Sequence, residues 1–205
     1  RNLLQEGIVS GVHCVGDVMY DAVLHFAPLA TMRSRVLEQL HLVPKKYLLV
    51  TVHRSANTDN RENLRHIFSA LDQLDEPIIF PLHPRTRAAW NALQIETRAH
   101  IRLIEPVGYL DMLNLEKHAR KILTDSGGVQ REAYYLGVPC ITLREETEWV
   151  ETIDDGWNVL VGTDVKQIAN AVETFDPSKD KPSGRLGDGH ASEKIVEILN
   201  RMEGR

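Results

Sequence analysis

The residues of this chain best suited to chemistry are Asp-Ser-Gly-Gly-Val-Gln-Arg-Glu-Ala at positions 125–133. They follow a short apolar run and lead into a helical pattern. Glycines let a ligand approach the backbone closely, and the first amides of a helix are unbonded and lie at the positive end of its dipole. The hydroxyl of Ser126 adds a further donor. Ser126, Gly127 and Gly128 are therefore predicted to bind an anion such as a phosphate.

Glu132 lies in the first or second turn of the same predicted helix. A carboxylate there would repel a phosphate, so its expected partner is a neutral diol such as a ribose. Taken alone, these residues also fit an ordinary tight turn between a strand and a helix, followed by a solvated glutamate. The surrounding elements help to decide between the two interpretations.

Six short apolar runs alternate with helical patterns along the chain. The predicted strands are residues 47–52, 77–82, 101–104, 122–124, 140–143 and 158–161. The predicted helices between and after them are residues 64–74, 85–93, 111–120, 129–136, 165–175 and 191–202. This alternation predicts an α/β fold with a doubly wound, parallel, six-stranded sheet of the Rossmann-like kind.

The first part of the chain is less regular. We expect a strand at residues 12–15, a helix capped by Asp17 that Pro28 ends or kinks, and a second helix at about 31–41. Residues 55–60 and 176–189 are predicted to be loops. Because the sequence begins with Arg1 and reads there like the end of a helix, we expect a fragment of a longer protein.

Composition narrows the function classes. With 205 residues, 42 % hydrophobic and 26 % charged, the chain resembles an ordinary globular protein. Its net charge of −5 argues against nucleic acid as a partner, and no apolar run is long enough for a membrane span. Cys14 and Cys140 are far apart in sequence, which predicts two buried thiols in a reducing, cytoplasmic protein.

Polar residues follow most of the predicted strands. They include His53 and Arg54, then His83, and later Ser126 and Arg144. In a parallel sheet these positions meet at one edge, where ligands bind. The histidines lack zinc-ligand spacing, so no metal site is expected. A Walker motif and a G-x-G-x-x-G motif are also missing from the sequence.

Five segments carry a family resemblance. In order, they are residues 51–54, 81–85, 124–133, 136–139 and 147–152. Together they resemble the C-terminal, UDP-binding half of non-hydrolysing UDP-N-acetylglucosamine 2-epimerases, and the resemblance runs from about residue 11 to residue 199. It implies the second domain of a GT-B-type two-domain enzyme. Its expected divisions are 1–40 (end of the first domain and connection), 41–190 (UDP-binding domain) and 191–205 (helix returning to the first domain).

The resemblance also implies roles for individual residues. Ser126, Gly127 and Gly128 would hold the diphosphate, and Glu132 would bind the ribose hydroxyls. Residues 106–112 would flank the uracil, with the main chain of Met112 contacting the base.

At the sugar end, the resemblance implies that His53 is the catalytic histidine and that Arg54 and His83 line the same cleft. Many bacterial members read Glu-Arg-Pro-Glu where this chain has Trp149 and Val150 at the two central positions. The role of that arginine is therefore not transferred, and a different UDP-sugar remains open.

The family reaction converts UDP-GlcNAc to UDP-ManNAc by eliminating UDP and adding it back after the proton at C2 is replaced. It needs no cofactor and serves cell-surface polysaccharide biosynthesis. The family's acidic catalytic residues lie in the first domain, so this chain is expected to bind UDP but to be inactive alone. The full-length enzyme is expected to be a homodimer. Two alternatives are the nucleotide-binding half of a GT-B glycosyltransferase and a non-catalytic UDP-sugar-binding module.

Overall fold

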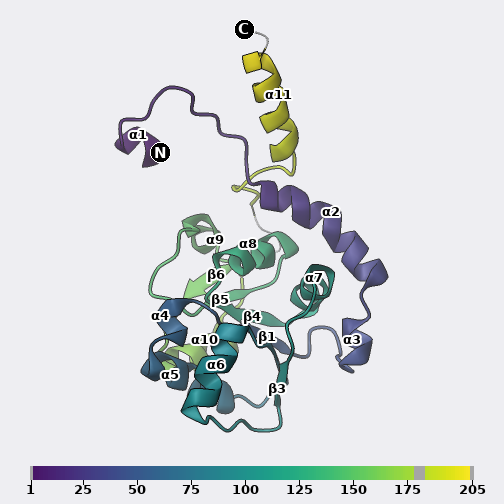
Figure 1. Cartoon of the computed structure of the whole chain (residues 1–205), viewed down its shortest axis with the longest axis vertical. Coiled ribbons are helices and arrows are strands. Elements are labelled where there is room, and N and C mark those ends of the chain that lie inside the picture. The colour runs from purple at the N-terminus through teal and green to yellow at the C-terminus, as the bar shows by residue number, and fades with distance from the viewer. Residues whose placement is uncertain (1, 178–182, 204–205) are drawn as a thin grey trace.

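The protein is built around a six-stranded parallel sheet with the order β3-β2-β1-β4-β5-β6 (Figure 1). The computed structural model describes residues 2–177 and 183–203. The strands are β1 (Leu48–Thr51), β2 (Ile78–Pro81), β3 (Ile101–Ile104), β4 (Lys121–Thr124), β5 (Cys140–Thr142) and β6 (Asn158–Leu160). The chain winds outward from β1 in one direction and from β4 in the other. This confirms the predicted doubly wound α/β fold.

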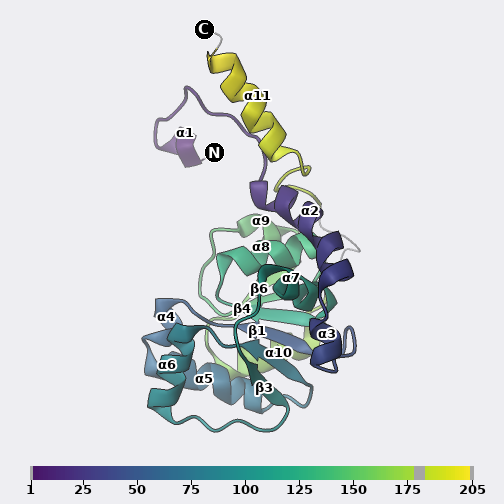
Figure 2. The same cartoon turned by 45° about the vertical axis from the view of Figure 1, so that its right-hand side comes forward.

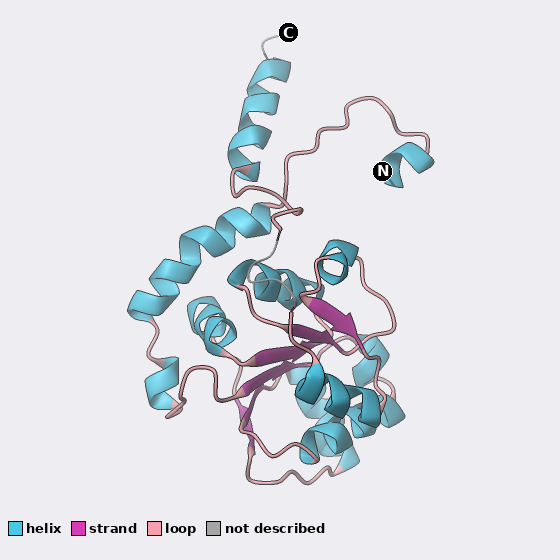
Figure 3. Cartoon of the chain, turned by 180° about the vertical axis from the view of Figure 1, so that it is seen from behind, coloured by secondary structure: helices cyan, strands magenta, loops and turns pink. Residues whose placement is uncertain are grey.

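Helices cover both faces of the sheet, as the view from behind shows (Figure 3). One face carries α5 (Arg61–Asp72), α6 (Pro84–Leu93) and α10 (Val165–Thr174). The other carries α3 (Val36–Gln39), α7 (Tyr109–His118) and α8 (Gly127–Leu136). Because both faces are buried, the strands appear in the sequence as continuous apolar runs.

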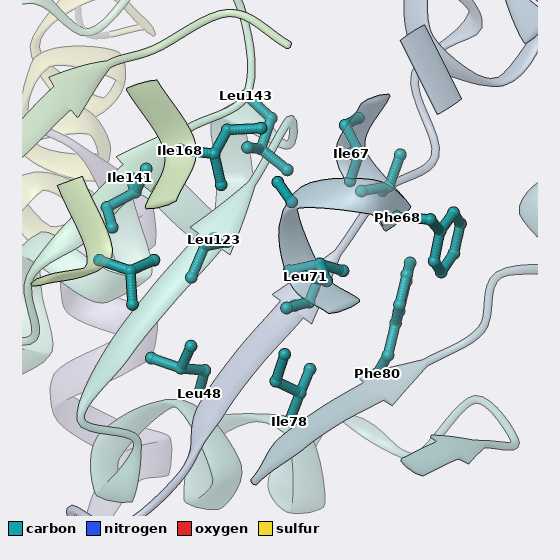
Figure 4. Close-up of a cluster of buried hydrophobic side chains, with 14 of the residues drawn as sticks. Leu48, Ile67, Phe68, Leu71, Ile78, Phe80, Leu123, Ile141, Leu143 and Ile168 are labelled. Atoms are coloured by element: carbon teal, nitrogen blue, oxygen red, sulfur yellow. The ribbon is translucent and has the colours of Figure 1, made fainter. Parts of the chain in front are cut away.

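Successive residues of a strand belong to the two different cores. In β1, Leu48 and Val50 pack with the α5 side, and Leu49 packs with the α7 and α8 side. Figure 4 shows the first cluster, where Phe68 of α5 stacks on Phe80 of β2 with ring centroids 5.6 Å apart. This packing fixes the strand ends that form the site.

The chain before the sheet differs from the prediction. Residues 12–15 form no strand, and α2 (Val18–Arg33) continues through Pro28. Pro28 is exposed while Val23 and Ala30 are buried against α7 and α8, so packing on both sides of the proline outweighs its missing N–H. The predicted helix 31–41 is wrong because α2 ends at Arg33 and only the short α3 follows.

Two short helices were not predicted. Residues 55–60 were expected to be a loop, but α4 (Ser55–Thr58) forms there, and α9 (Val150–Asp154) follows β5. Asn57 of α4 is buried and donates from Nδ2 to Leu143 O at 3.0 Å. Polar contacts of this kind, not apolar periodicity, hold α4 in place.

The two ends of the chain project away from the sheet. α1 (Asn2–Gln5) and α11 (Ala191–Glu203) stand at the same end of the molecule (Figures 1 and 2). Asp21 of α2 accepts hydrogen bonds from the first amides of α11, at 3.1 Å from Ala191 N and 2.7 Å from Ser192 N. Of the predicted loop 176–189, residues 178–182 lie outside the described part.

The two cysteines have different environments. Cys140 is buried as predicted, but Cys14 is exposed, because the segment that contains it forms no strand and does not enter the core. Among the described residues, no helix is both long and apolar enough to span a membrane.

Candidate functional site

The candidate site lies at the carboxyl ends of β1 and β4, where the direction of winding reverses. The two strands are neighbours, and Thr51 at the end of β1 pairs with Thr124 at the end of β4. Their hydroxyl oxygens are 2.6 Å apart. In sheets of this kind the crevice at the reversal point is the place where ligands bind.

Asp125 joins the two strand ends. It is fully buried and accepts hydrogen bonds from His53 N at 3.0 Å, Arg54 N at 2.9 Å and Asn57 Nδ2 at 3.0 Å. Asp125 belongs to the motif at residues 125–133, but no function was predicted for it. Its position directly after a central buried strand was the available signal. Asp125 fixes the loop that carries His53 and Arg54 against the start of α8.

The start of α8 offers free hydrogen-bond donors. Ser126 is its N-cap, and Ser126 Oγ accepts from Val129 N at 3.4 Å. The amides of Gly127 and Gly128 donate to no group in the described part of the chain. Ser126 is 9 % exposed, but its hydroxyl proton is not used by the capping bond. The turn thus presents two amides, a hydroxyl and a helix dipole.

His53, His83 and Met112 meet at a cavity of about 180 Å³ that Pro106 and Val107 also line. The imidazole centroids of His53 and His83 are 5.3 Å apart. Burial lowers the pKa of His53, and the nearby His83 and Arg54 lower it further, while Asp125 opposes them. The balance favours a neutral His53 imidazole, which can accept a proton.

Met112 lines this cavity. Its amide donates to Gly108 O at 2.9 Å, inside the first turn of α7. The main-chain N–H of Met112 is therefore engaged by the helix. No side chain caps the preceding amides, because the N-cap residue is Gly108.

Glu132 is part of a buried acidic pair with Glu116 of α7. Glu132 is 8 % exposed and Glu116 is fully buried, with neither carboxyl oxygen bonded to a donor in the described residues. Burial, then the charge of Glu132, raises the pKa of Glu116 well above its usual value. Burial also raises the pKa of Glu132, although the Tyr109 hydroxyl opposes this. A protonated Glu116 beside an ionised Glu132 satisfies both groups.

Most charged residues at the other strand ends have partners. The ion pairs are Arg85–Asp59 at 2.8 Å, Arg87–Glu105 at 2.8 Å and Arg144–Glu148 at 2.9 Å. Arg54 forms no ion pair within residues 2–177 and 183–203. Of the arginines predicted at the strand ends, Arg54 is therefore the one available to an anionic ligand. In those same ranges, no three His, Cys, Asp or Glu side chains could hold a metal ion together.

Comparison with known proteins gives a consistent result. A model of the UDP-N-acetylglucosamine 2-epimerase family matches residues 1–200. A UDP-N-acetylglucosamine 2-epimerase homolog of Methanococcus maripaludis is 49 % identical over 206 residues, which cover 98 % of this chain and 58 % of the relative. A UDP-2,3-diacetamido-2,3-dideoxy-D-glucuronate 2-epimerase of Pseudomonas aeruginosa is 39 % identical over 208 residues, covering 98 % and 57 %.

Solved structures with a similar fold belong to the same kind of enzyme. The crystal structure of Methanocaldococcus jannaschii UDP-GlcNAc 2-epimerase in complex with UDP-GlcNAc and UDP superposes with a TM-score of 0.89 at 41 % identity. The match covers 98 % of this chain and 58 % of that one, so the chain spans little more than half the length of its relatives. The predicted resemblance is confirmed: the chain belongs to the UDP-N-acetylglucosamine 2-epimerase family.

Proposed function

We propose that this chain is the nucleotide-binding half of a UDP-sugar 2-epimerase that converts UDP-GlcNAc to UDP-ManNAc by elimination and re-addition of UDP. One observation carries the proposal. The free amides of Gly127 and Gly128 and the carboxylate of Glu132 belong to the same helix, which starts at the central crevice beside His53. The Methanocaldococcus relative, crystallised with UDP-GlcNAc and UDP, supports the same ligand.

In this proposal the diphosphate binds the start of α8. The amides of Gly127 and Gly128, the Ser126 hydroxyl and the helix dipole stabilise the charge on UDP as it leaves. Glu116 holds the shared proton, so Glu132 stays ionised and accepts hydrogen bonds from the ribose hydroxyls. The base lies against the cavity wall that Met112 contributes.

The sugar then lies towards His53, the proposed catalytic residue. Its lowered pKa keeps the imidazole neutral, and Arg54 and His83 line the same side of the crevice. Elimination also requires acid and base groups at C2 and C3 of the sugar. We propose that the part of the enzyme beyond this chain supplies them, as the first domain of a GT-B-type enzyme that contacts α1 and α11. A cytoplasmic setting and a homodimer stay predictions.

A glycine substitution tests the site. A Cβ at Gly128 would meet Ser126 Oγ at 3.6 Å, which is ordinary contact, and alanine favours helices over glycine by up to about 1 kcal/mol. Gly128→Ala should therefore fold at least as stably as wild type. Its methyl group would block the approach of a phosphate, so calorimetric titration should give a UDP affinity at least about tenfold lower. Uridine, which lacks phosphate, is the matched control ligand and should bind unchanged. Equal UDP affinity in the two proteins would refute the phosphate site.

The reaction is tested with the whole protein. In D₂O the full-length enzyme should form UDP-ManNAc from UDP-GlcNAc with deuterium at C2, whereas this chain alone should bind UDP without turnover. The Pseudomonas relative is named for a different UDP-sugar, so UDP-2,3-diacetamido-2,3-dideoxy-D-glucuronate should be assayed beside UDP-GlcNAc. Transfer of the sugar to an acceptor, with no deuterium uptake, would instead identify a glycosyltransferase.

A further inference from the structure

The indole of Trp149 lies directly over the glycine turn at the start of α8. A Cβ built on Gly127 would be 2.9 Å from Trp149 Nε1 and 3.6 Å from Arg54 Nη2. Gly127 is buried beneath this cover, while Gly128 beside it is half-buried. The indole N–H of Trp149 donates to no acceptor among the described residues. A half-buried donor is thus held above the free amides without a protein partner.

The position of the ring is fixed by α8 itself. The guanidinium of Arg131 stacks on the indole, 3.9 Å from the ring centroid, and Asp17 holds Arg131 Nη1 at 2.8 Å. On the backbone side, Trp149 N donates to Thr147 Oγ1 at 3.1 Å, and that hydroxyl donates to Gln130 Oε1 at 2.6 Å. The indole N–H is therefore preorganised and does not have to be ordered by a ligand.

The nearest groups around this N–H are donors or cations, and the neighbouring carboxylate of Glu148 is already paired with Arg144. The amides of Gly127 and Gly128 are free, and Arg54 has no ion pair with the described residues. A ligand that satisfies all of them must present several acceptor oxygens close together and carry negative charge. A sugar hydroxyl could accept one of these bonds, but a diphosphate can accept all of them at once.

We infer that Trp149 is a ligand-binding residue that donates its indole N–H to a non-bridging oxygen of the nucleotide diphosphate. The inference rests on the proposed function and adds to it a diphosphate contact at a position where the sequence departs from many family members. Arg131 does not make this contact, because it is occupied by the indole ring and Asp17. Its part is to position the ring.

The test substitution is Trp149→Phe, which keeps an aromatic ring for Arg131 and removes the N–H together with part of the indole surface. A hydrogen bond to a charged group contributes about 1.5–3 kcal/mol, so the UDP affinity measured by calorimetry should fall about tenfold or more. Uridine affinity and the unfolding midpoint should be unchanged. Trp90→Phe is the matched control, because Trp90 packs on Phe68 on the α5 side of the sheet. It should leave UDP affinity unchanged.

A second readout is the indole ¹H–¹⁵N NMR signal of Trp149, assigned by its loss in Trp149→Phe. UDP should shift this signal and uridine should not. If wild type binds UDP but Trp149→Phe binds it equally well, or loses UDP and uridine affinity alike, the inference is overturned while the proposed function stands. If wild type fails to bind UDP, the proposed function itself is wrong.

Discussion

At the scale of single residues, the carboxyl pair of Glu116 and Glu132 is the most constrained chemistry in the molecule. Two carboxylates buried side by side cannot both be ionised without a large electrostatic cost. Burial raises the pKa of both groups, and that of Glu116 is raised well above its usual value, so Glu116 retains the shared proton. The folded protein therefore binds a proton here that the unfolded chain releases at neutral pH.

This proton makes stability depend on pH. Because the folded-state pKa of Glu116 lies above its unfolded value, the free energy of unfolding falls as pH rises between those two values, by about 1.4 kcal/mol per pH unit. Glu116→Gln carries no such proton, and its amide can still donate to Glu132. Urea denaturation at about pH 5, 6 and 7 should show a stability gain over wild type that grows with pH. Exposed Glu173→Gln should show no such trend. A gain that stays constant with pH would contradict the shared proton.

The second prediction at the scale of single residues concerns Asp125. Its carboxylate is the common acceptor for two backbone amides and Asn57. Asp125→Asn removes the charge and turns an amide group towards these donors, so the free energy of unfolding should fall by about 2–3 kcal/mol. Asp59→Asn, at an exposed ion pair with Arg85, should cost less than about 1 kcal/mol. Equal losses in the two variants would show that Asp125 does not organise the loop.

At the scale of elements, α8 is set by its two ends. Ser126 caps its start, and Gly137 ends it in the left-handed conformation with φ 64°. There Val138 N donates to Ala133 O at 2.9 Å, which satisfies a free carbonyl of the last turn. The helix that bears the free amides is thereby fixed in length and direction.

The two glycines at the start and end of α8 are predicted to respond differently to substitution by alanine. Gly137→Ala forces a side chain into the left-handed region and should lower the free energy of unfolding by about 1 kcal/mol, with Gly137→Asn costing less. Gly128→Ala, in the first turn of the same helix, should not lower it. Urea denaturation of the three variants measures the difference. A loss at Gly128 as large as at Gly137 would mean that the turn, not the ligand, requires that glycine.

The sequence predicted elements where apolar periodicity alone determines them. All six strands, α5, α6, α7, α8, α10 and α11 follow from apolar runs and caps. The start of α2 and its Asp17 cap are as predicted, but the prediction failed at the end of α2 and at α4, where packing around Pro28 and the buried hydrogen bonds of Asn57 decide the structure. Both the packing and the hydrogen bonds involve segments distant in sequence, and the periodicity of apolar residues does not reveal such contacts.

The same limit applies to the site. His53 and His83 line one cavity at the strand ends, and Met112 of α7, which was predicted to lie beside the base, lines the same cavity. Glu116 and Trp149 were missed because their significance lies in contacts between elements. Glu116 reads as a helical surface residue until α8 is packed against α7, and Trp149 reads as a departure from a motif until its indole is seen over Gly127.

At the scale of the whole molecule, helices bury both faces of the sheet, but the terminal helices α1 and α11 leave apolar side chains exposed. Leu4 of α1 and Val196, Leu199 and Met202 of α11 are exposed, at the end of the molecule away from the sheet. Exposed apolar side chains grouped in this way favour association. They support the proposal that the rest of the enzyme contacts α1 and α11.

The isolated chain should therefore associate weakly with itself. Sedimentation velocity over a concentration series should show a rising average mass for wild type and a smaller rise for the double variant Val196→Gln, Leu199→Gln. Its unfolding midpoint should be unchanged, because both side chains are exposed. Val43→Gln, an exposed apolar residue far from α11, is the control. Association that is unaffected by the α11 substitutions would place the contact elsewhere.

Asp17 connects this outer region to the glycine turn. It caps α2 through Met19 N at 2.9 Å and also accepts from Arg131 Nη1 at 2.8 Å and Tyr135 Oη at 2.7 Å. These bonds outweigh burial and lower its pKa, so the carboxylate stays charged. Arg131 in turn carries the indole of Trp149. One carboxylate and one guanidinium therefore join the start of α2 to the glycine turn by a chain of contacts that does not pass through the sheet.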